Sequence, residues 1–356
     1  MSTARIGIVW NPSKTTREEL EEALEQAIEA SGARPEVIWE ETAEDDPGRR
    51  AAERAVEAGA GLVIAAGGDG TVRAVAEHLA ESGGDVELGI APLGTGNLLA
   101  RNLEVPLGDL AAALERALTA DARPIDFAWA EVEIDGAPQR CGFAVMAGFG
   151  IDAHMITETD DELKDKVGWL AYVESLGRAI SASEVIGIRI GLDDEPVVAS
   201  EAHTLIVGNC GSLQGGVTLL PDADPADGRL DLLLLDAEGI GGWLDTLRNL
   251  VWDNGLKRLL PGRRGSGEEA DGGAADAPDP GTPGSGTAGG EAAGEAAGGA
   301  PGETAGAESS ATASHRQAER VSVELSEPRA FEVDGDHLGE TTRFEISIQP
   351  AALRVR

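Results

Sequence analysis

Residues 62–71 read Leu-Val-Ile-Ala-Ala-Gly-Gly-Asp-Gly-Thr, an apolar run of strand length that passes straight into a glycine-rich loop. A helix is predicted after Thr71, so strand, glycine loop and helix follow one another as in a βαβ unit. In such a unit the loop lies at the carboxyl end of a parallel strand, where ligands bind. Glycines let the backbone approach a phosphate there, and the helix N-terminus offers it free N–H groups.

The carboxylate of Asp69 is the unusual feature of this loop, because it repels a phosphate. Its presence is explained if Asp69 holds a Mg²⁺ ion that bridges to the phosphates. The alternative is an ordinary glycine turn in which Asp69 caps the helix. The sequence leaves both interpretations open.

A second glycine loop follows the next predicted strand. Residues 92–97 read Pro-Leu-Gly-Thr-Gly-Asn and lie between an apolar strand at 88–91 and a short helix at 98–103. Because ligands in parallel sheets bind at the carboxyl ends of the strands, two such loops can face one nucleotide from two sides. The pair is therefore stronger evidence for a nucleotide site than either loop alone.

The first 127 residues alternate strand and helix throughout. Thr16 and Glu19 have the spacing of a capping box at the start of a helix that runs to about Glu29. Strands are predicted at 5–10, 36–39, 62–65 and 88–91, and helices after Thr16, Pro47 and Thr71. This order predicts an α/β domain over residues 1–127, with a mainly parallel sheet and helices on both faces.

Residues 128–356 show a different pattern, which predicts a second, mainly antiparallel β domain whose last residues are free to return to the first. Short strands are predicted at 128–134, 140–147, 186–192, 203–209, 230–235, 321–325, 330–333 and 342–348, with one helix at roughly 160–181. Residues 262–318 contain no Ile, Leu, Val, Met or aromatic residue, and they carry nine acidic and three basic side chains. Because such a stretch has nothing to bury, we predict a disordered acidic insert there.

The chain of 356 residues has 28 basic and 64 acidic side chains, a net charge of −36. This charge repels nucleic acid, which we therefore exclude as a partner. The two cysteines, Cys141 and Cys210, support neither a disulfide framework nor a thiolate metal site. No apolar run has the length of a membrane span, and no secretory signal is recognisable at the N-terminus, so we expect a cytoplasmic protein.

The two glycine loops, followed by Ala100-Arg101, resemble the diacylglycerol kinase catalytic domain family, which includes bacterial soluble lipid kinases and the sphingosine and ceramide kinases. The resemblance extends over nearly the whole chain except residues 262–318. Further matching segments are Asn11-Pro12, Ile125-Asp126, residues 147–153, residues 224–230 and residues 333–336.

This resemblance implies a two-domain ATP-dependent lipid kinase, with ATP on the first domain and the lipid in the cleft between the domains. It implies that Asp334 is the general base and that Asp69 and Asp126 serve Mg²⁺ through water. Asp224, Asp227 and the carbonyl of Arg229 would hold a second, structural Mg²⁺. The implied ATP contacts are Asn11, Gly67, Gly68, Asp69, Gly70, Thr71, Gly94, Thr95, Gly96, Asn97 and Asp336.

Two positions depart from the family pattern. Leu98 stands where diacylglycerol kinases of the family usually have Asp, and Asp336 stands where the family has Glu. Sphingoid-base kinases also lack an acid at the first position, so the acceptor is either a diacylglycerol-like or a sphingoid lipid. The departures leave a non-catalytic nucleotide- or lipid-binding protein as an alternative. NAD kinase is a further alternative, but its second motif is Asn-Glu rather than the loop found here.

Three questions stay open in the sequence. The predicted helix at 242–260 has an apolar stripe and ends near Lys257 and Arg258, so it either docks at a membrane surface or packs on a sheet. Asp152 either orients groups in the cleft or caps a turn. A homodimer is neither indicated nor excluded.

Overall fold

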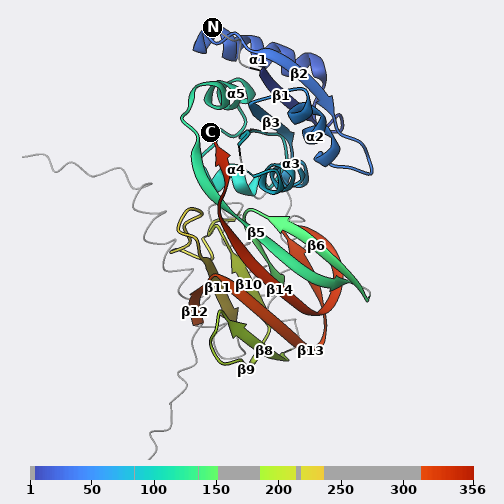
Figure 1. Ribbon diagram of the computed structural model, residues 1–356, viewed down its shortest axis with the longest axis vertical. Coiled ribbons are helices and arrows are strands. Elements are labelled where there is room, and N and C mark those ends of the chain that lie inside the picture. The colour runs from blue at the N-terminus through green and yellow to red at the C-terminus, as the bar shows by residue number, and fades with distance from the viewer. Residues whose placement is uncertain (1–4, 84, 135, 151–184, 214–217, 236–313) are drawn as a thin grey trace, which may run out of the picture. The chain divides into compact units, whose positions relative to one another are not determined.

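The computed structural model describes residues 5–83, 85–134, 136–150, 185–213, 218–235 and 314–356, which belong to one compact unit of the chain (Figure 1). The helices expected at 160–181 and 242–260, Asp152, and residues 262–313 of the expected insert lie outside the described residues. None of the described helices is long and apolar enough to cross a membrane.

The first domain is built on parallel strands in the order β2-β1-β3-β4. These strands are β1 Arg5–Trp10, β2 Glu36–Glu41, β3 Leu62–Gly67 and β4 Glu87–Pro92. One face packs against α1 Arg17–Ser31 and α5 Leu110–Thr119, and the other against α2 Arg49–Glu57, α3 Asp69–Glu81 and the short α4 Leu98–Asn102. The capping box predicted from Thr16 and Glu19 is confirmed at the start of α1.

Strands β1, β3 and β4 are buried on both faces, as their continuous apolar runs indicate. Ile8 and Ile64 belong to the core under α1 and α5. Val9 and Val63 alternate with them and belong to the core under α2 and α3. All four side chains are fully buried, so each strand contributes to two cores at once.

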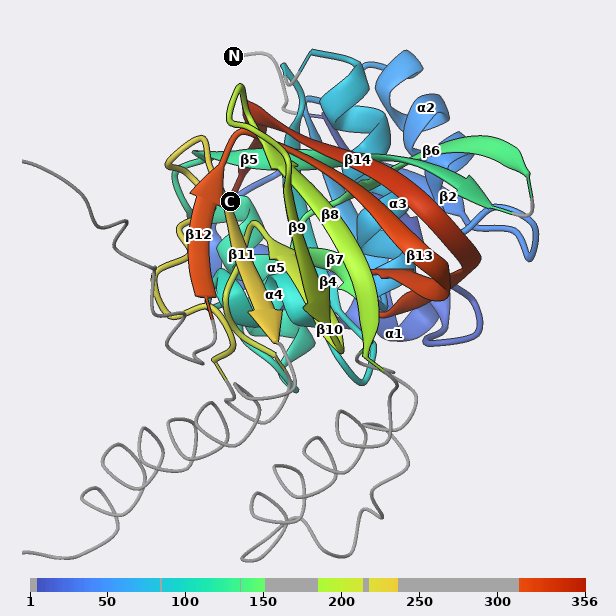
Figure 2. The same ribbon diagram turned by 90° about the horizontal axis from the view of Figure 1, so that it is seen from below.

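The second domain is antiparallel and has its own core (Figure 2). Its strands are β5 Arg123–Ile134, β6 Ala137–Phe143, β7 Met146–Phe149, β8 Ile186–Leu192, β9 Val198–Ala202, β10 Thr204–Gly208, β11 Leu230–Leu235, β12 Ser314–Ala318, β13 Arg320–Val333 and β14 Asp336–Val355. Phe143, Phe331 and Phe344 are fully buried in this core. The fold class predicted from the sequence, a mainly parallel α/β domain followed by an antiparallel β domain, is confirmed.

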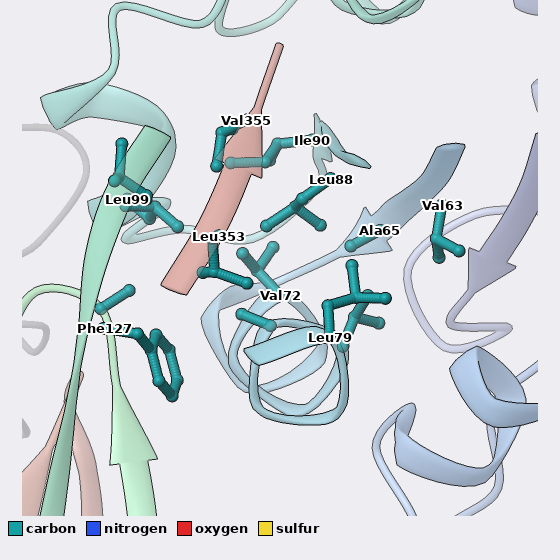
Figure 3. Close-up of a cluster of buried hydrophobic side chains, with 14 of the residues drawn as sticks. Val63, Ala65, Val72, Leu79, Leu88, Ile90, Leu99, Phe127, Leu353 and Val355 are labelled. Carbon is teal, nitrogen blue, oxygen red and sulfur yellow. The ribbon is translucent and has the colours of Figure 1, made fainter. Parts of the chain in front are cut away.

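The last strand, β14, returns to the first domain. It pairs with β13 and β5 for most of its length, and Val355 then pairs in parallel with Leu88 of β4. Figure 3 shows that Leu353 and Val355 of β14 lie in the same buried cluster as Leu88 of β4 and Leu79 of α3. The end of the chain therefore covers the open edge of β4.

Two segments are divided into strands differently from the prediction. The segment expected at 140–147 is interrupted between β6 and β7, where the N–H groups of Ala144 and Val145 donate to the carboxylate of Asp334 instead of to a strand. The strands expected at 321–325 and 330–333 form the single strand β13, whose pairing with β14 shifts register between Glu324 and Arg329.

The predicted insert ends earlier than expected, because Ser314–Ala318 forms β12 and pairs antiparallel with β11. Ala318 is fully buried in the core of the second domain. A single small apolar residue at the end of a polar segment gave no sign of this strand in the sequence. The prediction of disorder was therefore wrong for these five residues.

Candidate active site

A cavity of about 550 Å³ lies where the loops after β3 and β4 face the turn between β13 and β14. Its size is in the usual range for small-molecule sites. The polar residues around it are Asn11, Lys14, Gly68, Asp69, Gly70, Thr71, Gly94, Thr95, Gly96, Glu332, Asp334 and Asp336. An apolar wall is formed by Met146, Phe149, Ile206, Leu213 and Leu219. Most of the residues expected to bind ATP thus meet in one cavity, opposite a hydrocarbon-like wall.

The first glycine loop turns tightly from β3 into α3. A Cβ on Gly67 would fall 2.5 Å from the Cβ of Thr71, so only glycine fits there. Gly68 is the N-cap of α3, and Gly68, Asp69, Gly70 and Thr71 all border the cavity. The N-terminus of α3 therefore faces the cavity, which favours an anion.

The second glycine loop is shaped by Asn97. Its Oδ1 accepts from the N–H of Gly94 at 2.8 Å, and its Nδ2 donates to the Gly94 carbonyl at 2.7 Å. Asn97 itself has the left-handed backbone, with φ at 48°. Arg101 Nε donates to the Gly96 carbonyl at 2.6 Å. Asn97 thus clamps the loop, and Gly94, Thr95 and Gly96 are the members that border the cavity.

Asp69 ties the two loops together. Its Oδ2 accepts from the N–H of Asn97 at 2.8 Å, and its Oδ1 accepts from the N–H of Leu98 at 2.5 Å. A Cβ on Gly94 would fall 2.7 Å from the Cα of Gly68, so the loops are also in direct contact. Burial raises the pKa of Asp69, while the two amide hydrogen bonds act to lower it. The carboxylate therefore has a structural task whether or not it also serves a cation.

Asp334 occupies the turn of the β13–β14 hairpin. It has φ at 47° and is followed by Gly335 at 86°, two left-handed residues as in a type I′ turn. Its buried carboxylate accepts three backbone N–H groups, from Ala144 at 2.9 Å, Val145 at 2.9 Å and Met146 at 3.0 Å. Burial raises its pKa to about 6, against the hydrogen bonds and the charge of Arg73. Asp334 is therefore ionised at neutral pH and can accept a proton within the physiological range.

Asp336 lies on the far side of the same turn, where Arg73 Nη2 donates to its Oδ2 at 2.6 Å. The sequence analysis missed Arg73, and it also missed Lys14, which borders the cavity as an exposed cation. Arg73 follows Asp69 by four residues on α3, so helical spacing places both on one side of the helix. The partner of Arg73, Asp336, lies 263 positions away in the sequence, so helical spacing could not have identified it.

Asp126 is not brought to the cavity. Its Oδ1 accepts from the N–H of Ala351 and its Oδ2 from the N–H of Gly228, both at 2.7 Å. Only 2% of the residue is exposed. Asp126 does not border the cavity that Asp69 borders, so the structure does not bring these two carboxylates together in one cavity.

The turn at residues 224–229 holds the other expected metal ligands. Asp224 Oδ1 accepts from the N–H of Ala226 at 3.0 Å, and Asp227 Oδ1 accepts from the N–H of Arg229 at 2.9 Å. Both aspartates are exposed. Two carboxylates next to a backbone carbonyl are ligand types that suit a hard cation, so a Mg²⁺ ion at this turn stays a prediction. In the described residues as a whole, this turn included, no group of three or more His, Cys, Asp or Glu side chains is placed to hold a metal.

Asn11 follows β1 and lies at the edge of the cavity. Its N–H donates to the Ala66 carbonyl at 3.0 Å, and its Oδ1 accepts from the N–H and the hydroxyl of Ser13. Asn11 thus fixes the loop that carries Lys14. Leu98 also borders the cavity, but its side chain belongs to the buried core of the first domain and its N–H donates to Asp69, so the position brings no carboxylate.

Comparison with known proteins gives a consistent result. Residues 5–130 match the sequence model of the diacylglycerol kinase catalytic domain, and residues 145–251 match that of the YegS C-terminal NAD kinase beta sandwich-like domain. A Pseudomonas aeruginosa protein named "probable lipid kinase YegS-like" is 35% identical over 263 residues, which cover 73% of this chain and 81% of that protein. A Staphylococcus epidermidis diacylglycerol kinase is 29% identical over 240 residues, which cover 65% of this chain and 70% of that protein.

The fold has relatives among solved structures. A diacylglycerol kinase from Bacillus anthracis superposes with a TM-score of 0.61, covering 100% of this chain and 97% of that chain. The sequence identity is 20%, so this similarity supports the fold.

Proposed function

The chain belongs to the diacylglycerol kinase catalytic domain family of lipid kinases, and from this premise we propose that it transfers the γ-phosphate of ATP to a hydroxyl group of a diacylglycerol-like or sphingoid lipid. The observation that carries the proposal is the position of Asp334. Asp334 borders one cavity together with two glycine loops and an apolar wall. A base, a phosphate-binding loop and a hydrocarbon surface are the parts that a lipid kinase needs.

The nucleotide end of the cavity is the N-terminus of α3 with the second glycine loop. Backbone N–H groups and the helix dipole there attract phosphate oxygens. Lys14 adds a positive charge at the same end. In this proposal Asp69 and Asn97 act indirectly, since they hold the two loops in the shape that receives the phosphates.

The acceptor end is the apolar wall, which would hold the hydrocarbon part of the lipid and leave its hydroxyl near Asp334. Asp334 Oδ1 already accepts two N–H groups, whereas Oδ2 accepts only one, from Ala144. Oδ2 therefore has a lone pair left for the hydroxyl proton. Removing this proton as the oxygen attacks the γ-phosphate is the role of a general base.

ATP and Mg²⁺ are the proposed cofactors. Asp69, Glu332, Asp334 and Asp336 make the cavity strongly acidic, so a polyphosphate needs a cation to enter it. A bound Mg²⁺ would neutralise charge on the phosphates. A second Mg²⁺ at Asp224, Asp227 and the Arg229 carbonyl would stabilise the turn there. Because the acceptor is a membrane lipid, we place the reaction at the cytoplasmic membrane surface.

The competing proposal is a non-catalytic nucleotide- or lipid-binding protein. It is favoured by Leu98, which puts a buried apolar side chain where a carboxylate would face the metal, and by Asp336, which is paired with Arg73. Incubation of the purified protein with labelled ATP, Mg²⁺ and a panel of diacylglycerols and sphingoid bases separates the two. Label in the organic phase supports the kinase, whereas ATP binding without label in any lipid supports the binding protein.

A further inference from the structure

Arg73 lies on α3, one helical turn after Asp69 and behind Asp336. Only 15% of its side chain is exposed, and its Nη2 donates to Asp336 Oδ2 at 2.6 Å. Its Nη1 lies 4.0 Å from Glu77 Oε1 on the next turn of the helix. A guanidinium buried to this extent needs carboxylate partners, and its short, charge-assisted bond to Asp336 is of the strong kind.

The turn that carries Asp334 is attached on two sides. On one side, the carboxylate of Asp334 is fixed by the N–H groups of residues 144–146 of the second domain. On the other side, Asp336 is fixed by Arg73 of the first domain. Gly70 lies next to this second attachment, since a Cβ there would be in ordinary contact with Asp336 Oδ2 at 3.4 Å. The second attachment joins the turn to the helix whose N-terminus faces the cavity.

We propose that Arg73 is a positioning residue, which holds Asp336 and thereby fixes the 334–336 turn against α3. The distance between the general base Asp334 and phosphates bound at the glycine loops then depends on this contact. The proposal rests on the proposed function, because the distance matters for phosphoryl transfer. Reactions of this kind depend on alignment, and a displacement of about 1 Å can cost about 100-fold in rate.

Kinetics of Arg73→Met, Arg73→Lys and Asp336→Asn test this role. Loss of the contact in Arg73→Met should lower kcat by roughly 10- to 100-fold, while its KM for ATP changes little because the glycine loops are untouched. Arg73→Lys keeps the charge and should recover part of kcat. The Arg73→Met/Asp336→Asn double variant should be no slower than the slower single variant, because each substitution removes the same ion pair between Arg73 and Asp336.

Hydrogen exchange of the backbone amides gives a readout that does not need activity. In Arg73→Met, amides of residues 330–340 and 144–146 should exchange about tenfold faster than in the parent, since the turn loses its attachment to α3. Arg49→Met is the matched control, because Arg49 pairs with Glu81 at the other end of α3 and lies away from the cavity. Its exchange in these segments and its kcat should equal those of the parent.

The outcomes separate this inference from the proposed function. Parent-like kcat in Arg73→Met, additive losses in the double variant, or unchanged exchange at the turn would each overturn the role of Arg73. If the parent transfers no phosphate to any lipid, the proposed function fails, while the exchange measurement still decides whether Arg73 holds the turn. If Arg73→Met does not fold, Arg73→Lys and Asp336→Asn carry both measurements, since Asp336 is 47% exposed in its side chain.

Discussion

Replacement of Asp334 by Asn tests the general base and the electrostatics of the site together. The carboxylate accepts N–H groups with both oxygens, two at Oδ1 and one at Oδ2. The amide oxygen of the variant can keep the bonds to Val145 and Met146, but its NH₂ group would face the N–H of Ala144. One buried donor then loses its acceptor, which costs about 1–3 kcal/mol of unfolding free energy. The variant also loses the negative charge, and that loss acts in the opposite direction at neutral pH.

The size of the charge effect follows from the pKa of Asp334, which burial raises from 3.8 to about 6. The folded protein therefore binds this proton more tightly than the unfolded chain does. The resulting stabilisation is complete below about pH 4 and is lost as the pH rises through about 6. At about 1.4 kcal/mol per pKa unit it amounts to about 3 kcal/mol in full and about 2 kcal/mol at about pH 4.5. The side-chain amide of Asp334→Asn binds no such proton, so the variant lacks this dependence.

Urea unfolding of both proteins at about pH 4.5 and about pH 7.5 measures the effect. The stability of the parent minus that of Asp334→Asn should be about 2 kcal/mol larger at the lower pH. Other carboxylates are common to both proteins and cancel in this difference. The same group should give kcat/KM of the parent an acid limb near pH 6, and Asp334→Asn should lower turnover by roughly 10²- to 10⁴-fold. An equal stability difference at both pH values, or near-normal turnover in the variant, would refute the reasoning.

Three further predictions concern the loops, the turn and the insert. Gly94→Ala places a Cβ against the backbone of Gly68, so it should lower the unfolding free energy by about 1–3 kcal/mol and weaken ATP binding. Urea unfolding and calorimetry measure these two effects. Gly61→Ala is the control and should change neither, because a Cβ on Gly61 meets open space. Mg²⁺ should raise the melting temperature of the parent, and Asp227→Ala should lose most of this rise; equal responses would make residues 224–229 an ordinary turn. A short Gly/Ser linker in place of residues 264–313 should leave melting temperature and activity nearly unchanged, because loop closure depends only weakly on length. Removing Ser314–Ala318 as well should lower the melting temperature, and equal melting of the two shortened proteins would show that β12 adds no stability.

The sequence was sufficient where a local pattern determines the structure. The apolar run before Gly67 and the run before Pro92 each predicted a parallel strand, and both loops lie at the carboxyl ends as expected. The capping box of Thr16 and Glu19 was also predictable, since its partners are three residues apart. In each case the contacts that decide the conformation lie within a few residues of one another.

The sequence was insufficient where the partner of a side chain is distant. Asp69 was predicted to serve a cation or to cap α3, yet its oxygens accept from residues 97 and 98 at the start of α4. The bond between Arg73 and Asp336 joins residues that are 263 positions apart. The first contact forms only once β3 and β4 have paired, and the second only after the two domains have come together, so no local spacing records either of them.

Asp126 is an example in which distant contacts change the meaning of a residue. The strands β5 and β14 both run from the second domain into the first, and their pairing shifts register between Gln349 and Leu353. Ala351, inside this irregularity, has a left-handed backbone with φ at 50°, and its N–H donates to Asp126 Oδ1. A buried carboxylate that accepts this N–H and that of Gly228 stabilises the bend and joins it to the turn of Asp224 and Asp227. β14 begins at Asp336 of the 334–336 turn and ends at β4, so the bend that Asp126 stabilises lies on the strand that connects this turn to β4.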